Sequence, residues 1–191
     1  MKQLFFVFML MIALNVNAQE GTHRYEIKSG ILQEFTDMDG HITPDVRYFD
    51  NYGDDEVQVQ TIDMGALGSF QNTTVTKKEK AWMYNEANKP TSFDNPTADL
   101  TFVNPSQAVI DKYKLVDTGE EEEYLGRKCR KFTYEITQGR KKKIINHTAW
   151  VYKGVILRSV MQNGRQITIF EVTDFQENAE VPAEVFVIPE K

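Results

Sequence analysis

Histidine and cysteine are the side chains of this chain whose chemistry suits a metal site or a nucleophile. The three histidines, His23, His41 and His147, fall in three separate predicted segments, and no two have the i, i+4 spacing that puts two ligands on one helix face. Zinc requires three or four convergent ligands, so we predict isolated histidines and no metal site. Cys129 is the only cysteine, and no local pattern supplies a group that lowers its pKa. A small buried apolar side chain is therefore its favoured interpretation, over a catalytic or partner-pairing thiol.

Known catalytic motifs are absent from the sequence. It contains no Gly-x-Ser-x-Gly elbow, no phosphate-binding glycine loop and no His-Glu-x-x-His pair. The acidic stretch at residues 37–40 lacks the third early ligand and the terminal glutamate of a calcium loop, so we interpret it as a turn. We predict no catalytic residues, no cofactor and no enzyme activity. A hydrolase is kept as an alternative function. It would require the fold to bring a nucleophile and a base together.

The N-terminus has the layout of a secretory signal peptide. Lys2 provides a positive start, residues 4–14 are apolar without interruption, and small residues precede a cleavage point between Ala18 and Gln19. The apolar stretch is too short for a stable transmembrane helix. We predict a signal peptide over residues 1–18 and a periplasmic or secreted protein. Because no cysteine directly follows the apolar stretch, at the position where bacterial lipoproteins are acylated, we expect no lipid anchor.

The remaining residues, 19–191, are predicted to form one domain, since their number suits one hydrophobic core. The formal net charge of −6 argues against a nucleic-acid partner, because a polyanion is repelled by an acidic protein. One cysteine cannot form an internal disulfide, so packing must stabilise the domain. We expect a monomer.

Short stretches rich in Val, Ile, Thr, Tyr and Phe alternate with Gly, Asn and Asp clusters, which is typical of a meandering antiparallel sheet. Asn163-Gly164 is the strongest hairpin signal, because a two-residue turn needs positive φ at both positions. Gly30 lies inside the first expected strand, where we predict a bulge or a sharp bend. The expected strands cover residues 25–35, 46–49, 57–64, 73–77, 80–85, 100–103, 130–137, 143–152, 155–161 and 165–175, followed by an extended stretch over residues 181–188.

Only one segment has the pattern of a helix. Asn104 is a good N-cap, Pro105 suits the first helical position, and Gln107 can complete a capping box. Apolar residues then fall on one face up to Tyr113. Because such a short helix needs tertiary support, we expect it to lie on the sheet.

Aromatic residues are numerous on the expected strands. If a curved sheet leaves its concave face incompletely filled, such side chains line an apolar pocket; otherwise they form ordinary core. Both interpretations stay open. The cavity candidates are Tyr48, Trp82, Phe132, Tyr134, Trp150, Tyr152 and Phe170.

Charged residues are clustered around one predicted hairpin. Residues 120–123 are acidic and are interpreted as a loop, and basic residues follow between positions 127 and 143. The hairpin either contacts anionic head groups or an acidic partner, or is a solvated hairpin whose lysines discourage edge pairing. The candidate contact residues are Arg140, Lys141, Lys142 and Lys143.

Several short motifs resemble exported proteins of the LolA/LolB/LppX-like lipoprotein-carrier superfamily. They are Gly126-Arg127-Lys128-Cys129, the strand pair from Trp150 through Lys153-Gly154 to Leu157, Val181-Pro182, and Phe186-Val187-Ile188-Pro189. The segment Tyr48–Gly53 is similar to a turn in uncharacterised Bacteroidetes members. The resemblance implies a half-open antiparallel barrel of about ten strands with helices plugging its mouth, and a cavity for acyl chains.

The sequence therefore predicts a mainly β (α+β) protein, built as a single curved antiparallel sheet or half-open β-barrel with one or a few short plugging helices. Its leading predicted function is non-enzymatic binding of a lipid or lipidated partner in the concave face, with the helix as a lid. The alternative is a cell-envelope protein-interaction module that acts through a sheet edge or the basic hairpin at residues 127–143.

Overall fold

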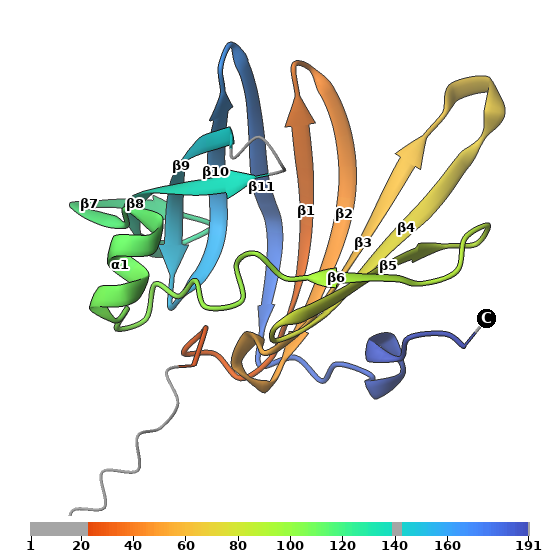
Figure 1. Ribbon diagram of the computed structural model, residues 1–191, viewed down its shortest axis with the longest axis horizontal. Helices are drawn as coiled ribbons and strands as arrows, with labels where there is room; N and C mark the ends of the chain where they lie inside the picture. Colours follow the sequence, from red (N-terminus) through yellow and green to blue (C-terminus); the bar gives the residue numbers. More distant parts are fainter. Residues whose placement is uncertain (1–22, 139–142, 191) are drawn as a thin grey trace, which may run out of the picture.

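The computed structural model describes residues 23–138 and 143–190, which form one antiparallel sheet with short helical segments (Figure 1). The strands are β1 (Gly30–Met38), β2 (His41–Asp50), β3 (Asp55–Asp63), β4 (Ser69–Lys77), β5 (Lys80–Asn85), β6 (Thr91–Asp94), β7 (Val116–Tyr124), β8 (Arg127–Gln138), β9 (Lys143–Tyr152), β10 (Val155–Asn163) and β11 (Gln166–Glu177). The helical segments are η1 (Asn51–Gly53), η2 (Gly65–Leu67), α1 (Gln107–Tyr113) and η3 (Ala183–Phe186). No helix among these residues is long and apolar enough to cross a membrane.

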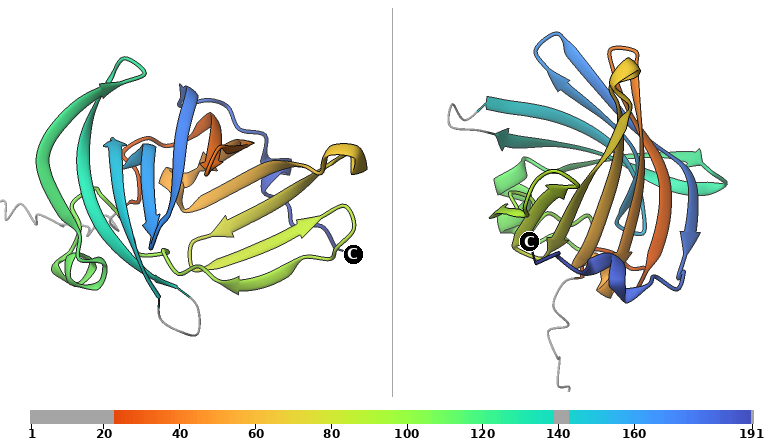
Figure 2. Two further views of the ribbon diagram at one scale, coloured as in Figure 1. Left: turned by 90° about the horizontal axis from the view of Figure 1, so that it is seen from above. Right: turned by 90° about the vertical axis from the view of Figure 1, so that its right-hand side faces the viewer.

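The 11-stranded sheet has the order β6-β5-β4-β3-β2-β1-β11-β10-β9-β8-β7. Within each half the strands follow one another as hairpins, because short turns make sequential strands antiparallel neighbours. The one long-range pairing joins β1 to β11 in the middle of the sheet. The sheet is strongly curved, so its two halves form the arms of an open half-barrel (Figure 2). We call strands β1 to β6 the first arm and strands β7 to β11 the second arm. The predicted fold class is confirmed.

The register defines which side chains share the concave face. Directly opposed residues in paired strands point to the same side, and a continuous row runs across six strands: Phe132, Ala149, Ser159, Phe170, Thr36 and Thr43. Helix α1 packs on this side, since its buried Val109 and Tyr113 cluster with Phe132 and Tyr134. We call this side the inner face and the other side the outer face.

One cluster of the hydrophobic core lies where β1 and β11 meet. Leu32, Phe49 and Val172 are fully buried in this cluster, and Phe175 is nearly so. Gly30 begins β1, and a Cβ at this position would lie 2.6 Å from the Phe49 ring and 2.8 Å from the Phe175 ring. The bulge predicted at Gly30 is wrong, because the irregularity of β1 lies between Gln33 and Glu34. The absence of a side chain at Gly30 provides space for the two aromatic rings.

Several predicted elements differ from the structure. Residues 25–29 precede β1 and are not strand, and residues 100–103 form a loop whose Leu100 is buried beside α1. Two strands were not predicted: β6, and β7, which contains the acidic stretch expected to be a loop. These glutamates are strand residues because ion pairs to the basic side chains of β8 offset their mutual repulsion.

The start of the helix, the last hairpin turn and the C-terminal stretch also differ from the prediction, and β2, β4 and β8 begin earlier than predicted. The N-cap of α1 is Ser106, whose hydroxyl accepts a hydrogen bond from the Val109 N–H at 3.3 Å, so the helix starts later than predicted. The β10–β11 turn consists of Gly164 and Arg165, since Asn163 pairs with Gln166. The extended stretch predicted over residues 181–188 contains η3 instead.

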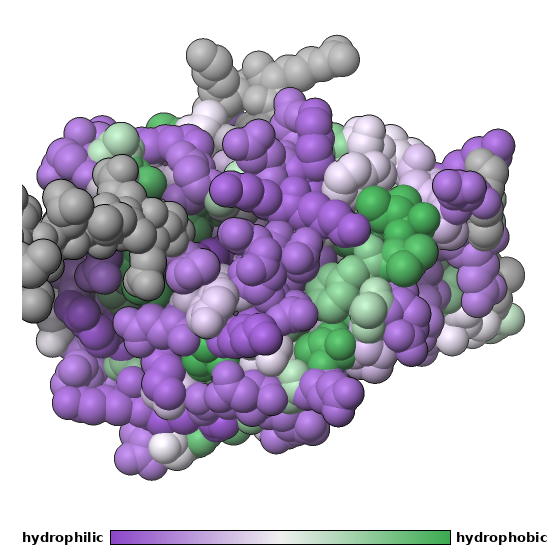
Figure 3. Space-filling view, turned by 90° about the horizontal axis from the view of Figure 1, so that it is seen from below, coloured by the Kyte–Doolittle hydropathy of each residue, from purple (hydrophilic) through white to green (hydrophobic). Residues whose placement is uncertain are grey.

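The C-terminal segment runs along the outside of the first arm, where η3 contacts β3 (Figure 2). On the outer face a row joins Tyr48, Val57, Val75 and Trp82, and both valines are buried. Seen from below, the surface is largely hydrophilic, with a hydrophobic patch toward the side of the C-terminus (Figure 3). Val187, which is exposed, belongs to the C-terminal segment.

Candidate functional site

The second arm of the half-barrel presents apolar side chains on its inner face. Ile136 of β8 opposes Ile145 of β9, and both stay half-buried. Met161 of β10 and Phe170 of β11 continue the same face and are also half-buried. We call these four residues the apolar arm. Part of each of these side chains is accessible to solvent, whereas the residues of the hydrophobic core are buried.

The first arm presents polar side chains on the same face. One row crosses five strands and contains only carboxyl and amide groups: Glu34, Asp45, Gln60, Asn72 and Asn85. The next row adds Gln58 and Thr74. We call these seven residues the polar arm. The concave face, which we call the inner groove, is thus amphipathic.

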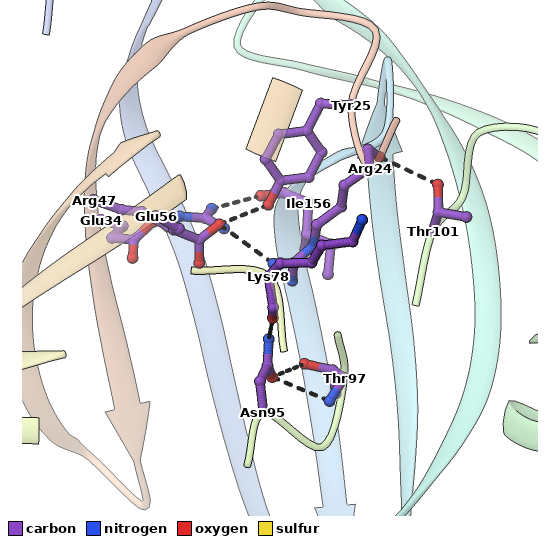
Figure 4. A network of polar contacts seen from close by, with 10 residues as sticks. All are labelled: Arg24, Tyr25, Glu34, Arg47, Glu56, Lys78, Asn95, Thr97, Thr101 and Ile156. Carbon is purple, nitrogen blue, oxygen red and sulfur yellow. Dashed lines mark hydrogen bonds and ion pairs between the residues drawn. The ribbon is translucent and has the colours of Figure 1, made fainter. Parts of the chain in front are cut away.

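A charged cluster lies at the base of the inner groove (Figure 4). The Arg47 side chain donates from Nε to Glu34 at 3.1 Å and from Nη2 to the Ile156 carbonyl oxygen at 3.2 Å. Its Nη1 atom lies 3.9 Å from Glu56. Because Ile156 belongs to β10 and Arg47 to β2, this side chain ties the two arms together across the concavity.

The N-terminal segment completes this charged cluster. The Tyr25 hydroxyl donates to Glu56 Oε2 at 2.8 Å, and Arg24 lies 3.8 Å from the same carboxylate (Figure 4). Burial opposes the charge on Glu56, but Arg24 and Arg47 keep its pKa below the usual value. Burial raises the pKa of Tyr25 to about 12, so its hydroxyl stays a donor.

Two carboxyl groups of the polar arm have raised pKa values. Burial raises the pKa of Glu34 even though Arg47 stabilises its charged form. Burial also raises the pKa of Asp45, although hydrogen bonds with Thr36, Gln60 and Gln58 act to lower it. The Thr36 hydroxyl and the Gln58 amide donate to Asp45 Oδ2, and the other oxygen, Oδ1, is buried.

His147 lies on the inner face of β9 and is buried. Its ring stacks on Tyr134 with centroids 4.7 Å apart and an interplanar angle of 15°. Burial lowers the pKa of His147 to about 4, so the imidazole is neutral near neutral pH. Phe102, from the loop before α1, packs on both Tyr134 and Phe132 and closes the lower end of the second arm.

A cavity of about 510 Å³ lies below the charged cluster, between the N-terminal segment, the β4–β5 turn and α1. Its lining includes Arg24, Lys78, Glu79, Asp99 and Val109, so polar and apolar groups line it in similar measure and it carries both signs of charge. This composition differs from the apolar cavity that the resemblance implies.

The structure separates the predicted aromatic cavity candidates. Phe132, Tyr134 and Phe170 lie on the inner face, but the first two are buried under α1 and Phe102. The other four lie on the outer face by register: Tyr48, Trp82, Trp150 and Tyr152. Only Phe170 belongs to the apolar arm.

The predicted contact hairpin is only partly described. Lys143 begins β9 and is exposed, whereas Arg140, Lys141 and Lys142, like the predicted cleavage residues Ala18 and Gln19, lie outside the described residues. The basic residues nearer the start of β8 are already paired with acidic side chains: Lys128 with Glu121, Arg130 with Asp117, Lys131 with Glu120, and Arg127 with Glu177. These pairs reduce the net charge that this part of the hairpin presents to a partner.

The side chains considered for catalysis lie apart. Cys129 is fully buried, and burial raises the pKa of its thiol to about 11. His23 stacks on Tyr52 outside the sheet, and His41 is exposed at the start of β2. Over residues 23–138 and 143–190, no group of three metal-ligating side chains was found. This arrangement does not favour a thiol nucleophile or a zinc site.

The charged cluster and the polar arm were not predicted from the sequence. The signal was present, because Asp45, Arg47 and Phe49 alternate along β2 and Glu34 follows Leu32 by two positions on β1. Residues two positions apart in a strand point to the same face of the sheet. Charged residues that lie on the same face as buried ones therefore indicate polar groups in the interior.

No family model and no curated protein matches the chain. Solved structures do match it. An uncharacterised conserved protein from Thermus thermophilus is 11% identical, with a TM-score of 0.54, over 88% of this chain and 90% of that chain. A chain of the Pseudomonas aeruginosa MucA/MucB complex is 15% identical, with a TM-score of 0.51, over 83% of this chain and 55% of that chain. A putative outer membrane lipoprotein-sorting protein domain from Vibrio parahaemolyticus is 12% identical, with a TM-score of 0.45, over 88% of this chain and 94% of that chain.

Some of these proteins are much longer than the region that matches; the chain spans 29% of PNGF-II, for example. At such low identities the likeness concerns the fold alone. The fold that the resemblance implies, an open curved antiparallel sheet with short helices, is confirmed by its likeness to the Thermus protein and to the MucA/MucB chain. The kinship with Bacteroidetes members stays a prediction.

Proposed function

We propose that this protein is an exported, non-enzymatic binding protein that holds a hydrophobic ligand, a lipid or a lipidated partner, in the inner groove. The observation that carries the proposal is the apolar arm, where Ile136, Ile145, Met161 and Phe170 line a concave surface without being fully buried. A ligand that covers about 200 Å² of apolar surface there gains about 5 kcal/mol from burial.

Helix α1 is the proposed lid of the groove. It has 7 residues and depends on Val109 and Tyr113 for its attachment to the sheet. An isolated helix of this length is unstable in water, so its position depends on these contacts. Movement of α1 with the loop that carries Phe102 changes access to the lower end of the apolar arm.

A protein partner is the second candidate ligand. A chain of the MucA/MucB complex, which is an assembly of two proteins, shares this fold at a TM-score of 0.51. If the ligand of the present chain is a protein, a segment of an envelope protein binds in the inner groove or along an open edge of the sheet.

The test uses two neighbouring residues that lie on opposite faces of β9. Ile145 belongs to the apolar arm, whereas Ile144 points to the outer face and is exposed. We expect the chain without residues 1–18 to bind a fluorescent fatty acid, 11-(dansylamino)undecanoic acid, with an increase in dansyl emission. The substitution Ile145→Asp is expected to weaken binding at least tenfold, and the matched control Ile144→Asp to leave it unchanged. A protein that takes up no probe and contains no lipid by mass spectrometry contradicts the proposal.

A further inference from the structure

The segment that precedes β1 crosses the lower end of the half-barrel, between turns that belong to different arms (Figure 1). We call residues 23–29 the clasp. The Tyr25 N–H donates to the Tyr52 carbonyl oxygen at 2.9 Å, in the β2–β3 turn of the first arm. The next N–H, that of Glu26, donates to the Lys153 carbonyl oxygen at 3.0 Å, in the β9–β10 turn of the second arm. The clasp therefore joins the two arms.

The two turns lie closer together at the clasp than they would in a flat sheet. Because Tyr25 and Glu26 are consecutive, the two carbonyl oxygens lie within about 10 Å of each other. Along the sheet the same turns are separated by four strand spacings, which amount to about 19 Å without curvature. The clasp therefore bridges turns that only the curvature of the sheet brings together.

Two glycines make room for the clasp. A Cβ at Gly53, in the β2–β3 turn, would lie 2.5 Å from the Tyr25 ring. A Cβ at Gly154, in the β9–β10 turn, would lie 2.7 Å from the Arg24 carbonyl oxygen. The clasp side chains Tyr25 and Ile27 are each 3% exposed. Close packing therefore keeps the clasp in place, although it belongs to no strand.

The clasp also contacts the loop that leads to the proposed lid. The Thr101 hydroxyl donates to the Arg24 carbonyl oxygen at 3.3 Å (Figure 4). Thr101 directly precedes Phe102, whose ring packs on Phe132 and Tyr134 at the lower end of the second arm. One short segment is thus attached to both arms and to the loop before α1.

We propose that the clasp controls the release of ligand from the inner groove, by detaching from the two turns and freeing the arms and the loop before α1 to move. This inference rests on the proposed function, since it assigns a regulatory part to the same site. Detachment leaves the strand pairing intact, because the clasp precedes β1 and is covalently joined to the sheet at one end only. While the clasp is attached, its bonds to both turns fix the separation of the arms, and the ligand dissociates slowly.

Alanine substitutions at matched glycines test the clasp. Gly53, Gly154 and Gly40 have φ values of 88°, 86° and 89°, so a Cβ strains the backbone similarly at each of them. A Cβ at Gly40, in contrast to the other two, would meet no atom within 4 Å. Gly53→Ala and Gly154→Ala therefore displace the clasp, whereas Gly40→Ala is the matched control.

Trypsin cleavage reports the attachment of the clasp without any ligand. The peptide bond after Arg24 lies in the clasp, and a protease requires this segment to be detached from the fold. Cleavage is measured by intact mass on the chain without residues 1–18. We expect it to be at least tenfold faster in Gly53→Ala and Gly154→Ala than in Gly40→Ala, which behaves as the wild type does.

The second measurement is the release of bound 11-(dansylamino)undecanoic acid. Excess undecanoic acid displaces the probe, and the loss of dansyl emission gives the dissociation rate. We expect dissociation at least fivefold faster from Gly53→Ala and Gly154→Ala than from Gly40→Ala. If the alanine variants do not fold, Tyr25→Phe replaces them, because it removes only the hydroxyl that donates to Glu56 at 2.8 Å. Its expected effect on both rates has the same direction and is about twofold.

The outcomes separate the inference from the proposed function. Faster cleavage with unchanged probe dissociation overturns the inference and leaves the proposed function standing. Equal cleavage in all three alanine variants also overturns the inference, because the clasp is then not held by close packing against the turns. Absence of probe binding by the wild type overturns the proposed function together with the inference.

Discussion

Acidification is expected to destabilise this protein through His147. The ring is 7% exposed and stacks on Tyr134, and burial lowers its pKa from 6.5 to about 4. Between these two values the unfolded chain binds a proton that the folded protein excludes. The contribution of His147 to stability is therefore complete above pH 6.5 and declines as the pH falls toward 4.

The size of the effect follows from the two pKa values. Linkage gives a loss of about 2 kcal/mol at about pH 5 and a limit of about 3 kcal/mol at lower pH. Glu34 and Asp45 act in the opposite direction, because burial raises their pKa values and folding then favours their protonated forms. The pH dependence of the unfolding free energy of the wild type therefore combines effects of opposite sign.

The assay isolates His147 by difference. Urea unfolding is measured at pH 7 and pH 5 for the wild type and for His147→Gln, which keeps a polar side chain of similar size but cannot titrate. Glu34 and Asp45 are present in both proteins, so their effects cancel. We expect the stability of the wild type relative to the variant to fall by about 2 kcal/mol between pH 7 and pH 5. A difference that stays constant over this range refutes the reasoning and means that His147 is hydrated in solution.

Three further experiments test the core, the charged cluster and the cysteine. Phe49→Ala is expected to destabilise the fold by about 3–5 kcal/mol in urea unfolding, because the side chain is fully buried, whereas Phe93→Ala at the sheet edge costs less than about 1 kcal/mol. Arg47→Met leaves Glu34 buried without its partner and is expected to cost about 3–5 kcal/mol at pH 7, and adding Glu34→Gln recovers a large part of the loss; an additive double variant contradicts this coupling. Cys129 is expected to react with Ellman's reagent only when the protein unfolds, since its thiol is buried and its pKa is raised to about 11; rapid labelling of the native protein contradicts the burial.

Local sequence patterns predicted the second half of the sheet closely. Residues 143–152 alternate cleanly and form β9 with the predicted bounds, and Lys153-Gly154 forms the predicted turn. These segments were predictable because strand alternation and turn chemistry depend on near neighbours. The strand β7 was missed because four successive glutamates disfavour a strand unless basic residues on the next strand pair with them.

The candidate site was less predictable than the fold. Of seven proposed aromatic residues, only Phe170 lies on the half-buried part of the inner face. Alternation along β9 shows that Trp150 and Ala149 face opposite ways, but it does not show which way is inward. The inner residue is Ala149, because its partners Phe132 and Ser159 both lie on the face that α1 covers.

The sequence by itself determined the chemistry available to this protein: a β-rich chain with one cysteine, three scattered histidines and no catalytic motif. Only the tertiary structure decided where that chemistry lies, since β1 pairs with β11 at the far end of the chain and the curvature sets which side is concave. That pairing brings Arg47 of β2 to Ile156 of β10 and turns Asp45 and Asn72 inward, opposite the apolar arm. The amphipathic groove is therefore a product of long-range register, which no local pattern contains.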